Sequence, residues 1–333
     1  MGYSDADRPL PAHFRISPAG TVVFSDNTPA ENPITNAGAA LGRVLFYDPR
    51  LSADNRISCS SCHRQAFGFG DTGRTSRGVG GRHPARRTMA LGNARFNARG
   101  RFSWDERAPS LEAQVLMPIE DSLEMGLPLD SLIQKLSATS YYPGLFAAAF
   151  GSPEVTRHGI ARALAQFVRA LASTESRFDA MFATGGAPDS TQLTTEEREG
   201  FRLFNRSGCV NCHRTIAQFA DQATSIGLDS VPADTGAGQG RFKPASLRNV
   251  AVRPPYMHDG RFGTLREVVE FYARKVQRSP GLDPRLVNAE GTPRRLSLTP
   301  EQTSALVAFL ESLTDTVFLQ DPRLASPFSC STP

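Results

Sequence analysis

Hydrophobic side chains recur at helical spacing in several segments of the chain. In residues 158–173 the apolar positions lie three or four residues apart and form one face of a helix: Ile160, Leu164, Phe167, Val168 and Leu171. Residues 264–276 and 299–313 repeat this spacing. Alternation of apolar and polar residues, which is typical of strands, is rare and short. The pattern therefore predicts an all-α protein.

Capping signals mark the start of three predicted helices. Thr194 with Glu197, and Thr264 with Glu267, have the spacing of capping boxes, in which each side chain accepts a hydrogen bond from the other residue's backbone N–H. The third helix is expected to begin at a threonine cap followed by proline, a residue favoured at the first helical position. Five residues of the helix after Thr264 fall on one apolar face: Leu265, Val268, Val269, Tyr272 and Val276.

Long Gly- and Pro-rich connections separate the helical segments; they span residues 68–87, 230–240 and 279–297. Connections of this length usually wrap a ligand or carry function. The stretch 183–195 is the best boundary between two domains. We therefore expect an N-terminal domain of residues 1–185 and a C-terminal domain of residues 186–333, whose tail can pack back on the first domain.

The composition is that of a soluble globular protein, with 40% hydrophobic and 21% charged residues. A chain of 333 residues is long enough for two domains of ordinary size. The net charge of +4 does not come from basic runs interleaved with aromatic residues, so the sequence does not indicate nucleic-acid binding. No apolar run reaches the ~20 residues that a membrane-spanning helix needs.

Two copies of one short motif carry the clearest chemistry. The sequences C-S-S-C-H and C-V-N-C-H both follow the pattern C-x-x-C-H, the attachment signal for c-type haem. Two thiols three residues apart can form thioethers with the vinyl groups of one porphyrin, and the histidine that follows can bind its iron. We expect two covalently bound c-type haems; Cys59, Cys62 and His63 hold the first, and Cys209, Cys212 and His213 hold the second.

Paired cysteines also occur in zinc sites and in thioredoxin-like redox motifs. A zinc site does not require a histidine directly after each pair. The redox motif normally occurs once, in a βαβ context that this sequence lacks. Haem attachment is therefore the better interpretation of both pairs.

Covalent haem of this type goes with an oxidising, extracytoplasmic compartment. The start MGYSDADRPL lacks the apolar core of a signal peptide. We therefore expect a periplasmic protein from which a signal peptide has been removed. The fifth cysteine, Cys330, is expected to be incidental.

Residues 104–126 hold the candidates for catalysis, since a catalyst leaves one haem open beside acid–base groups. Ser110 can cap a short helix that carries Gln114 and that Pro118 ends. Glu124 follows in a turn-like region between two large apolar residues. Taken alone, this context favours a solvated carboxylate over a partly buried one.

Four stretches resemble the bacterial di-haem cytochrome c peroxidase/MauG family: LGRVLFYDPRLSADNRISCSSCH, residues 104–126, LRNVAVRPPYMHDGRFGTLREVVEFY and LTPEQTSALVAFLESL. In that family a Trp lies between the haems, and a Gln and a Glu ten and twenty residues further on lie over the peroxidatic haem. The resemblance implies these roles for Trp104, Gln114 and Glu124, whose spacing matches.

The resemblance implies a di-haem peroxidase that reacts with hydrogen peroxide at the N-terminal haem. Electrons would come through the C-terminal haem from a small redox protein. One alternative is a MauG-like oxidase that modifies side chains of a partner protein. Another is a non-enzymatic di-haem electron carrier, against which the Gln114 and Glu124 pair counts. The protein is expected to act as a monomer or a dimer.

Two departures from the family pattern change these expectations. Classical members close the peroxidatic haem with a loop histidine, but residues 64–82 contain none; Val79 aligns with that ligand, and the nearest histidine is His83. The first haem is therefore expected to be open, as in MauG-like members. Arg87 stands where the family offers a calcium-binding Asn, which makes calcium doubtful, although carbonyl groups near Pro255 could contribute.

Two residues are candidates for the sixth ligand of the second haem. Met257 is of a type familiar in high-potential c-type haems. Tyr272 falls on the inward face predicted for its helix, a position that also suits an ordinary core tyrosine. The resemblance favours Tyr272, because classical peroxidases carry their ligand Met at that helix position and MauG carries Tyr. A phenolate ligand would lower the reduction potential of the haem.

Overall fold

The computed structural model describes residues 2–15, 22–183, 187–214, 217 and 222–328; Cys330 lies outside them. Regular structure in these residues is helical, with only isolated β-bridges between loops, which confirms the all-α class. No described helix is long and apolar enough to cross a membrane. The α-helices are α1 (Ala12–Arg15), α2 (Asn36–Tyr47), α3 (Cys59–Cys62), α4 (Leu111–Gln114), α5 (Met117–Glu120), α6 (Leu129–Ser137), α7 (Tyr142–Phe150), α8 (Arg157–Ala170), α9 (Arg177–Ala180), α10 (Thr195–Arg206), α11 (Leu265–Glu270), α12 (Pro300–Glu311) and α13 (Thr316–Gln320).

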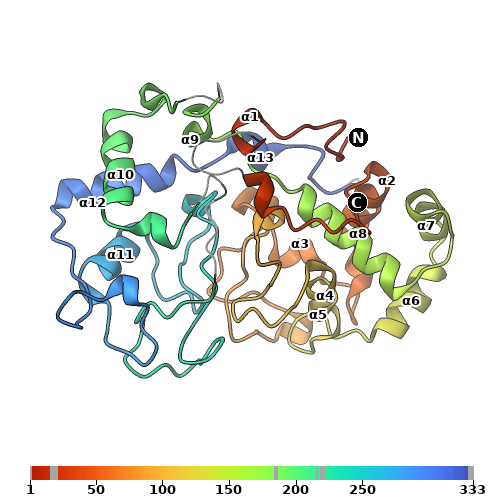
Figure 1. Ribbon diagram of the computed structural model, residues 1–333. Helices are drawn as coiled ribbons and strands as arrows, with labels where there is room; N and C mark the ends of the chain where they lie inside the picture. Colours follow the sequence, from red (N-terminus) through yellow and green to blue (C-terminus); the bar gives the residue numbers. More distant parts are fainter. Residues whose placement is uncertain (1, 16–21, 184–186, 215–216, 218–221, 329–333) are drawn as a thin grey trace, which may run out of the picture.

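The helices form two groups that lie side by side, with α2, α6, α7 and α8 on one side and α10, α11 and α12 on the other (Figure 1). Each group has its own hydrophobic core. The core of the second group also takes up Phe14, Phe96 and Phe178 from the first part of the chain. The division into residues 1–185 and 186–333 stays a prediction, and its boundary falls partly on residues that are not described.

The two groups are built on the same helix crossing. A Cβ added at Gly42 in α2 would overlap the carbonyl oxygen of Ala163 in α8, and one added at Gly200 in α10 would overlap that of Ala305 in α12. The close approach requires glycine at both places. The repeated crossing is also visible in the sequence as two short motifs. Helices α2 and α10 share G-x-x-L-F, and helices α8 and α12 share A-L-x-x-F.

The predicted capping boxes are confirmed. Thr194 caps α10 with Glu197, Thr264 caps α11 with Glu267, and Thr299 caps α12, where Gln302 completes a box.

The helix predicted after Thr264 changes its winding before its end. Instead of one α-helix, α11 stops at Glu270 and the chain continues as the π-helix Phe271–Lys275. Pro118 also differs from expectation. The short helix capped by Ser110 ends at Gln114, and Pro118 lies in the first turn of the next helix, α5, where a missing N–H costs nothing.

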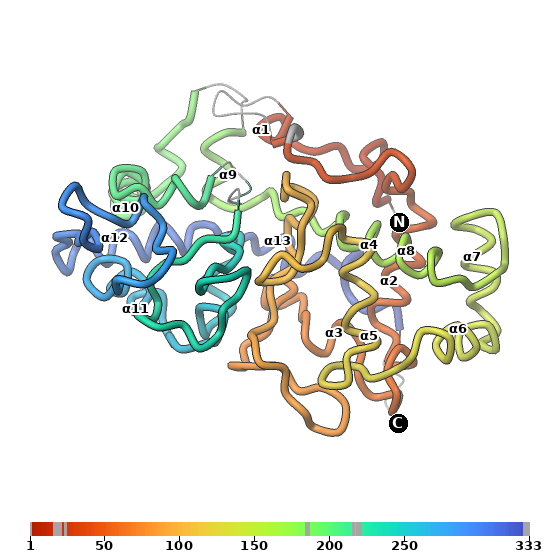
Figure 2. Tube along the Cα trace, turned by 60° about the horizontal axis from the view of Figure 1, so that its bottom comes forward, coloured from red at the N-terminus to blue at the C-terminus, as the bar shows by residue number. Residues whose placement is uncertain are grey.

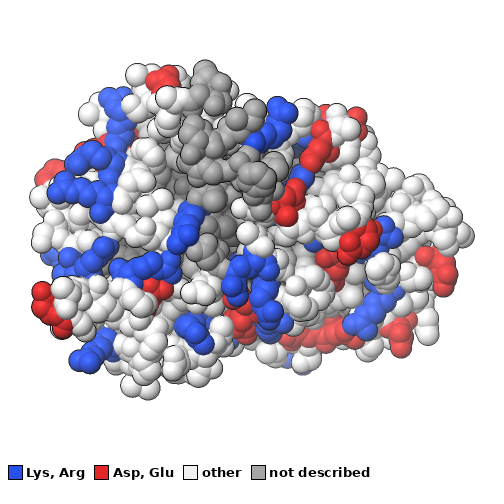
Figure 3. All heavy atoms as spheres, in the orientation of Figure 1, with Lys and Arg blue, Asp and Glu red and all other residues white. Residues whose placement is uncertain are grey.

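The C-terminal segment crosses back from α12 to the N-terminal helices, as both chain traces show (Figures 1 and 2). Phe318 of α13 joins the core of the first group. Arg43 Nε donates to the carbonyl oxygen of Ala325 at 2.6 Å, and Gln65 Nε2 donates to that of Asp321 at 2.8 Å. On the face seen in Figure 3, basic and acidic side chains both occur, and the basic ones are spread over both groups.

Candidate active site

The first C-x-x-C-H motif folds as one helical turn. Ser58 and Ser61 form a capping box around α3, and the backbone N–H of His63 donates to the carbonyl oxygen of Cys59 at 2.9 Å. Residues three apart on a helix share a face, so Cys59 and Cys62 lie on the same side. His63 Nδ1 lies 3.0 Å from the carbonyl oxygen of Phe69. A proton on Nδ1 fits this contact and leaves Nε2 free to bind a metal.

The second motif makes the same turn with a tighter winding. Cys209–Asn211 is a 3-10 helix, and the N–H of His213 donates to the carbonyl oxygen of Cys209 at 3.0 Å. Cys212 is the residue that ends this helix. Both histidines are therefore fixed by their own cysteine turn, a local property of the five-residue motif.

Cys59, Cys62 and Cys209 are free thiols. Burial raises the pKa of Cys59 to about 12 and those of Cys62 and Cys209 to about 11. No group of three or more His, Cys, Asp or Glu converges among the described residues. The arrangement is unlike that of a four-thiolate zinc site, in which the thiols must meet at one point.

A cavity of about 930 Å³ lies beside the first motif. Its lining includes all three residues predicted for catalysis, Trp104, Gln114 and Glu124, and two of those predicted to hold the first haem, Cys62 and His63. They come from α3, from α4 and from two connecting loops, which are far apart in sequence. Cys59 packs against the core of the first helical group instead. The predicted catalytic residues and the first haem ligand thus meet at one place.

Glu124 is half-buried in the turn after α5. Its backbone N–H donates to the carbonyl oxygen of Asp121 at 3.0 Å, and its own carbonyl oxygen accepts from Val79 N at 2.8 Å. None of the described residues hydrogen-bonds its carboxylate. Burial raises the pKa of Glu124, and the negative charge of Asp121 raises it further. The group can therefore hold or release a proton closer to neutral pH than an exposed glutamate.

Gln114 lies at the end of α4, where Ser110 fixes the helix start by accepting a hydrogen bond from Ala113 N at 3.1 Å. The Gln114 Oε1 atom accepts a hydrogen bond from Ser103 Oγ at 2.6 Å. This contact holds the side-chain amide at the wall of the cavity.

In the loop of residues 64–82, Val79 stands at the position expected for a closing histidine and is not part of the cavity lining. Val79 is buried and bonds to the Glu124 turn, while Gly78 borders the cavity. A Cβ at Gly78 would collide with the backbone of Leu123 and Glu124. His83 is exposed and contacts Thr75 Oγ1 at 3.2 Å. Among the described residues, no loop histidine lines this cavity other than His258, which belongs to the second half of the chain.

A second cavity, of about 240 Å³, lies beside the second motif; its lining includes Cys209, Cys212, His213, Met257 and Tyr272. The π-helical winding presents Tyr272 to this cavity, and such turns are frequent at functional sites. Burial raises the pKa of Tyr272, as do the nearby Cys212 and Cys209 thiols. Met257 stands in a turn with a positive φ of 73°. The fold brings both candidate ligands to the same cavity.

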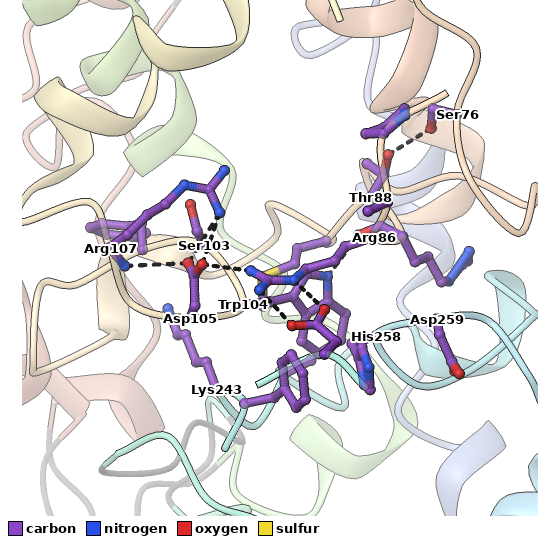
Figure 4. A pocket seen from close by; sticks show the side chains of 18 of the residues that line it. Ser76, Arg86, Thr88, Ser103, Trp104, Asp105, Arg107, Lys243, His258 and Asp259 are labelled. Atoms are coloured by element: carbon purple, nitrogen blue, oxygen red, sulfur yellow. Dashed lines mark hydrogen bonds and ion pairs between the residues drawn. The ribbon is translucent and has the colours of Figure 1, made fainter. Parts of the chain in front are cut away.

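Trp104 lines both cavities. Its Nε1–H donates to the carbonyl oxygen of Arg87 at 2.6 Å, and its carbonyl oxygen accepts from Lys243 N at 2.7 Å. The ring centroids of Trp104 and His258 are 6.4 Å apart in an edge-on arrangement. Figure 4 shows the indole in the middle of the labelled side chains, between Asp105 and His258.

Arg87 occupies a cradle of backbone oxygens between the two halves of the chain. Its guanidinium donates to four carbonyl groups, those of Asp71, Gly73, Arg253 and Pro254; the bonds to the last three measure 2.9, 2.8 and 3.2 Å. Carbonyl oxygens in such a cluster are also what Ca²⁺ prefers. At this cluster of carbonyl oxygens the chain therefore supplies a cation of its own.

Several residues of the site were not predicted from the sequence. His258, Lys243 and Arg253 line both cavities, and Arg86 lines the first, where it bridges Asp105 and Asp234. His258 directly follows Met257 in PYMHDG, which was the one available signal. The others are single basic residues in loops, and their meaning depends on burial.

A helical fold with two cavities, each bordered by a C-x-x-C-H motif and one lined by a half-buried glutamate, has the arrangement of a di-haem oxidoreductase. Residues 36–186 match the family model described as di-haem cytochrome c peroxidase. The chain is 36% identical to the methylamine utilization protein MauG of Methylorubrum extorquens over 297 residues, which cover 86% of this chain and 80% of that protein.

It is also 32% identical to the cytochrome c551 peroxidase of Nitrosomonas europaea over 288 residues, which cover 83% of this chain and 79% of that protein. Among solved structures, a MauG-like protein associated with microbial copper homeostasis superposes with a TM-score of 0.79 at 30% identity, covering 91% of this chain and 97% of that one. The di-haem peroxidase BthA of Burkholderia thailandensis shares the fold, with a TM-score of 0.71.

The chain belongs to the di-haem cytochrome c peroxidase family. It is an oxidoreductase of the peroxidase type, with haem as its cofactor.

Proposed function

We propose that each C-x-x-C-H motif binds one haem covalently, through Cys59 and Cys62 in the first half and through Cys209 and Cys212 in the second. The residues fit such a group, because Cys59, Cys62 and Cys209 are free thiols and a proton on His63 Nδ1, donated to Phe69, leaves Nε2 in the unprotonated form that binds iron. When bound, the haem in the first cavity supplies the redox chemistry that consumes hydrogen peroxide.

Glu124 is proposed as the acid–base group for that reaction. Cleavage of the peroxide bond needs the proton of one oxygen to move to the departing oxygen, and a carboxylate within reach of both can carry it. The raised pKa of Glu124 suits this double task, since the group must accept the proton and then release it. Gln114, held by Ser103, would orient the peroxide at the same wall.

Trp104 is proposed as the route for electrons between the two haems. It lines both cavities, and hydrogen bonds at its indole and at its backbone fix it there. The electrons would come from a small redox protein through the second haem. Covalent haem attachment, as proposed, supports a periplasmic location for this chemistry.

Tyr272 is proposed as the sixth ligand of the second haem, with Met257 as the alternative. The π-helix that presents Tyr272 supports this choice. A metal ion would have to drive the deprotonation of the phenol, because burial holds its pKa high.

The function that the site supports best is reduction of hydrogen peroxide, and one observation carries it: Glu124, a partly buried carboxyl group, shares the first cavity with His63. A non-enzymatic carrier would not need an acid–base group there.

Oxidation of side chains on a partner protein is a second candidate. It is favoured by Val79, which packs on the Glu124 turn where classical members place a closing histidine. Calcium between the halves is proposed to be absent, since the guanidinium of Arg87 already binds the carbonyl oxygens there.

The test is to add one equivalent of hydrogen peroxide to the ferric protein without a donor and to follow its absorption spectrum. A rapid change at both haems, reversed by a redox protein, would support the peroxidase. A persistent oxidised state that a redox protein reduces only slowly would support oxidation of a partner. A spectrum that peroxide leaves unchanged would overturn both.

A further inference from the structure

Two buried arginines lie against each other at the junction of the cavities. Arg87 and Arg253 are 5% and 9% exposed, and both line both cavities. An Arg87 Nη2–H donates to the carbonyl oxygen of Arg253 at 2.8 Å. The Arg253 side chain also reaches toward the first half of the chain, because a Cβ at Gly70 would lie 3.5 Å from its Cδ.

The hydrogen-bond partners of the two guanidinium groups differ sharply. Arg87 donates to four carbonyl oxygens. Arg253 donates from Nη2 to the carbonyl oxygen of Ser246, and its buried Nε has no partner among the described residues. A buried N–H without a hydrogen-bond partner is unusual in proteins. A guanidinium group carries five N–H donors in all, so it can hold a ligand with several hydrogen bonds.

The charge of Arg253 also lacks a counter-ion in the described chain. Burial and the neighbouring charge of Arg87 lower the pKa of Arg253 to about 10, so the group is still a cation at neutral pH. The aromatic neighbour Tyr256 uses its hydroxyl to donate to the carbonyl oxygen of Val250 at 3.2 Å. No described aspartate or glutamate forms an ion pair with Arg253. A buried, unpaired cation is costly unless an anion from outside the chain neutralises it.

We propose that Arg253 is the receptor for a haem carboxylate at the junction of the two cavities, a role that rests on the proposed presence of two haems. The planar fork of arginine matches a carboxylate with two parallel hydrogen bonds. Each haem carries carboxylate side chains, and both cavities border this one guanidinium. Arg253 would thereby hold the cofactor carboxylate at the junction that both cavities share.

The proposal is tested in the haem-loaded protein with Arg253→Gln and Arg253→Lys. Arg266→Gln is the matched control, because Arg266 is an exposed arginine of the same half that donates a hydrogen bond to Ser304 and lines neither cavity. Haem content is measured by mass, and the reduction potentials of both haems by spectroelectrochemical titration from about pH 5 to about pH 8, the range in which a carboxylate freed of its partner titrates.

Loss of the cation should lower the reduction potential of at least one haem, because a nearby positive charge favours the reduced iron. It should also raise the pKa of the carboxylate by roughly 1–2 units, so that Arg253→Gln gains a pH-dependent segment that the wild type and Arg266→Gln lack. Arg253→Lys should fall in between, since it keeps the charge but not the fork.

Potentials and pH profiles of Arg253→Gln that equal those of the control would overturn the proposal while leaving the two haems in place. Absence of haem from the wild type would overturn the proposed function instead. If Arg253→Gln does not fold, infrared redox-difference spectra of the wild type with ¹³C-labelled haem carboxylates decide. A haem carboxylate that stays ionised from about pH 8 down to about pH 5 supports the proposal, and haem carboxylates that all take up a proton within this range refute it.

Discussion

Trp104 donates its indole N–H to the backbone oxygen of Arg87 at 2.6 Å, while the guanidinium of Arg87 binds carbonyl groups from both halves of the chain. One residue therefore holds the halves together and also fixes the ring between the cavities. This links the stability of the junction to the position of the indole that is proposed to carry electrons.

Glu124→Gln should slow the reaction with hydrogen peroxide by about two orders of magnitude, since the amide cannot carry the proton. Both haems should remain bound. Stopped-flow spectroscopy with excess peroxide measures the rate constant. Glu120→Gln is the control, because Glu120 is an exposed glutamate on α5 outside the cavity lining. Equal rate constants for the two variants would show that Glu124 is a bystander.

The reaction with hydrogen peroxide should also become slower at acid pH. Burial and the charge of Asp121 raise the pKa of Glu124. Its carboxylate is therefore protonated at a higher pH than that of an exposed glutamate, and the protonated group cannot accept the peroxide proton. Asp121→Asn removes the charge contribution and should move this acid limb to lower pH. A pH–rate profile of the two proteins checks the shift, and a limb that moves to higher pH contradicts the assignment.

Tyr272→Phe should open the second haem, because it removes only the phenolic oxygen. We expect the low-spin signal to disappear from the electron paramagnetic resonance spectrum, and Tyr272→Met to raise the reduction potential. Met257→Leu should leave both properties as in the wild type. The opposite pattern would make Met257 the ligand and remove one reason for a MauG-like function.

Arg87→Ala should destabilise the protein by roughly 2–5 kcal/mol, because it strips a buried junction of its cation and leaves carbonyl oxygens unpaired. Millimolar guanidinium should restore part of the loss, and a calcium chelator should leave wild-type activity unchanged. Denaturant unfolding measures the effect. Arg74→Ala is the control, since Arg74 is exposed and its Nε donates to the carbonyl oxygen of Asp259. Chelator-sensitive wild-type activity would refute this role of Arg87.

Gly42→Ala and Gly200→Ala should each cost about 1–3 kcal/mol through overpacking, although alanine is the better helix former. The added methyl group would overlap a carbonyl oxygen of the facing helix in both cases. Gly144→Ala in α7 is the control. No atom lies within 4 Å of its added Cβ, so the change should be neutral or stabilising by about 0.5–1 kcal/mol. Thermal unfolding distinguishes the three variants.

The sequence alone determined the features that depend on neighbours a few residues apart. Local spacing determines the C-x-x-C-H turns, the capping boxes at Thr194 and Thr264 and the helical class. These features depend on contacts within one segment, so they do not require knowledge of how the segments pack. The shared motif G-x-x-L-F is equally local, but its meaning as a helix crossing needed the partner helix.

Tertiary structure decided the properties that depend on burial and on which side chains meet. Glu124 looked solvated in its own segment; packing of residues 78–79 against its turn makes it a half-buried acid with a raised pKa. Arg87 and Arg253 are ordinary loop arginines in sequence. The two residues are 166 positions apart along the chain. Both guanidinium groups lose their water only because the two halves of the chain pack against each other. Ion pairs and hydrogen bonds are stronger where water is excluded, because the local dielectric constant is low. No local sequence pattern encodes that exclusion of water.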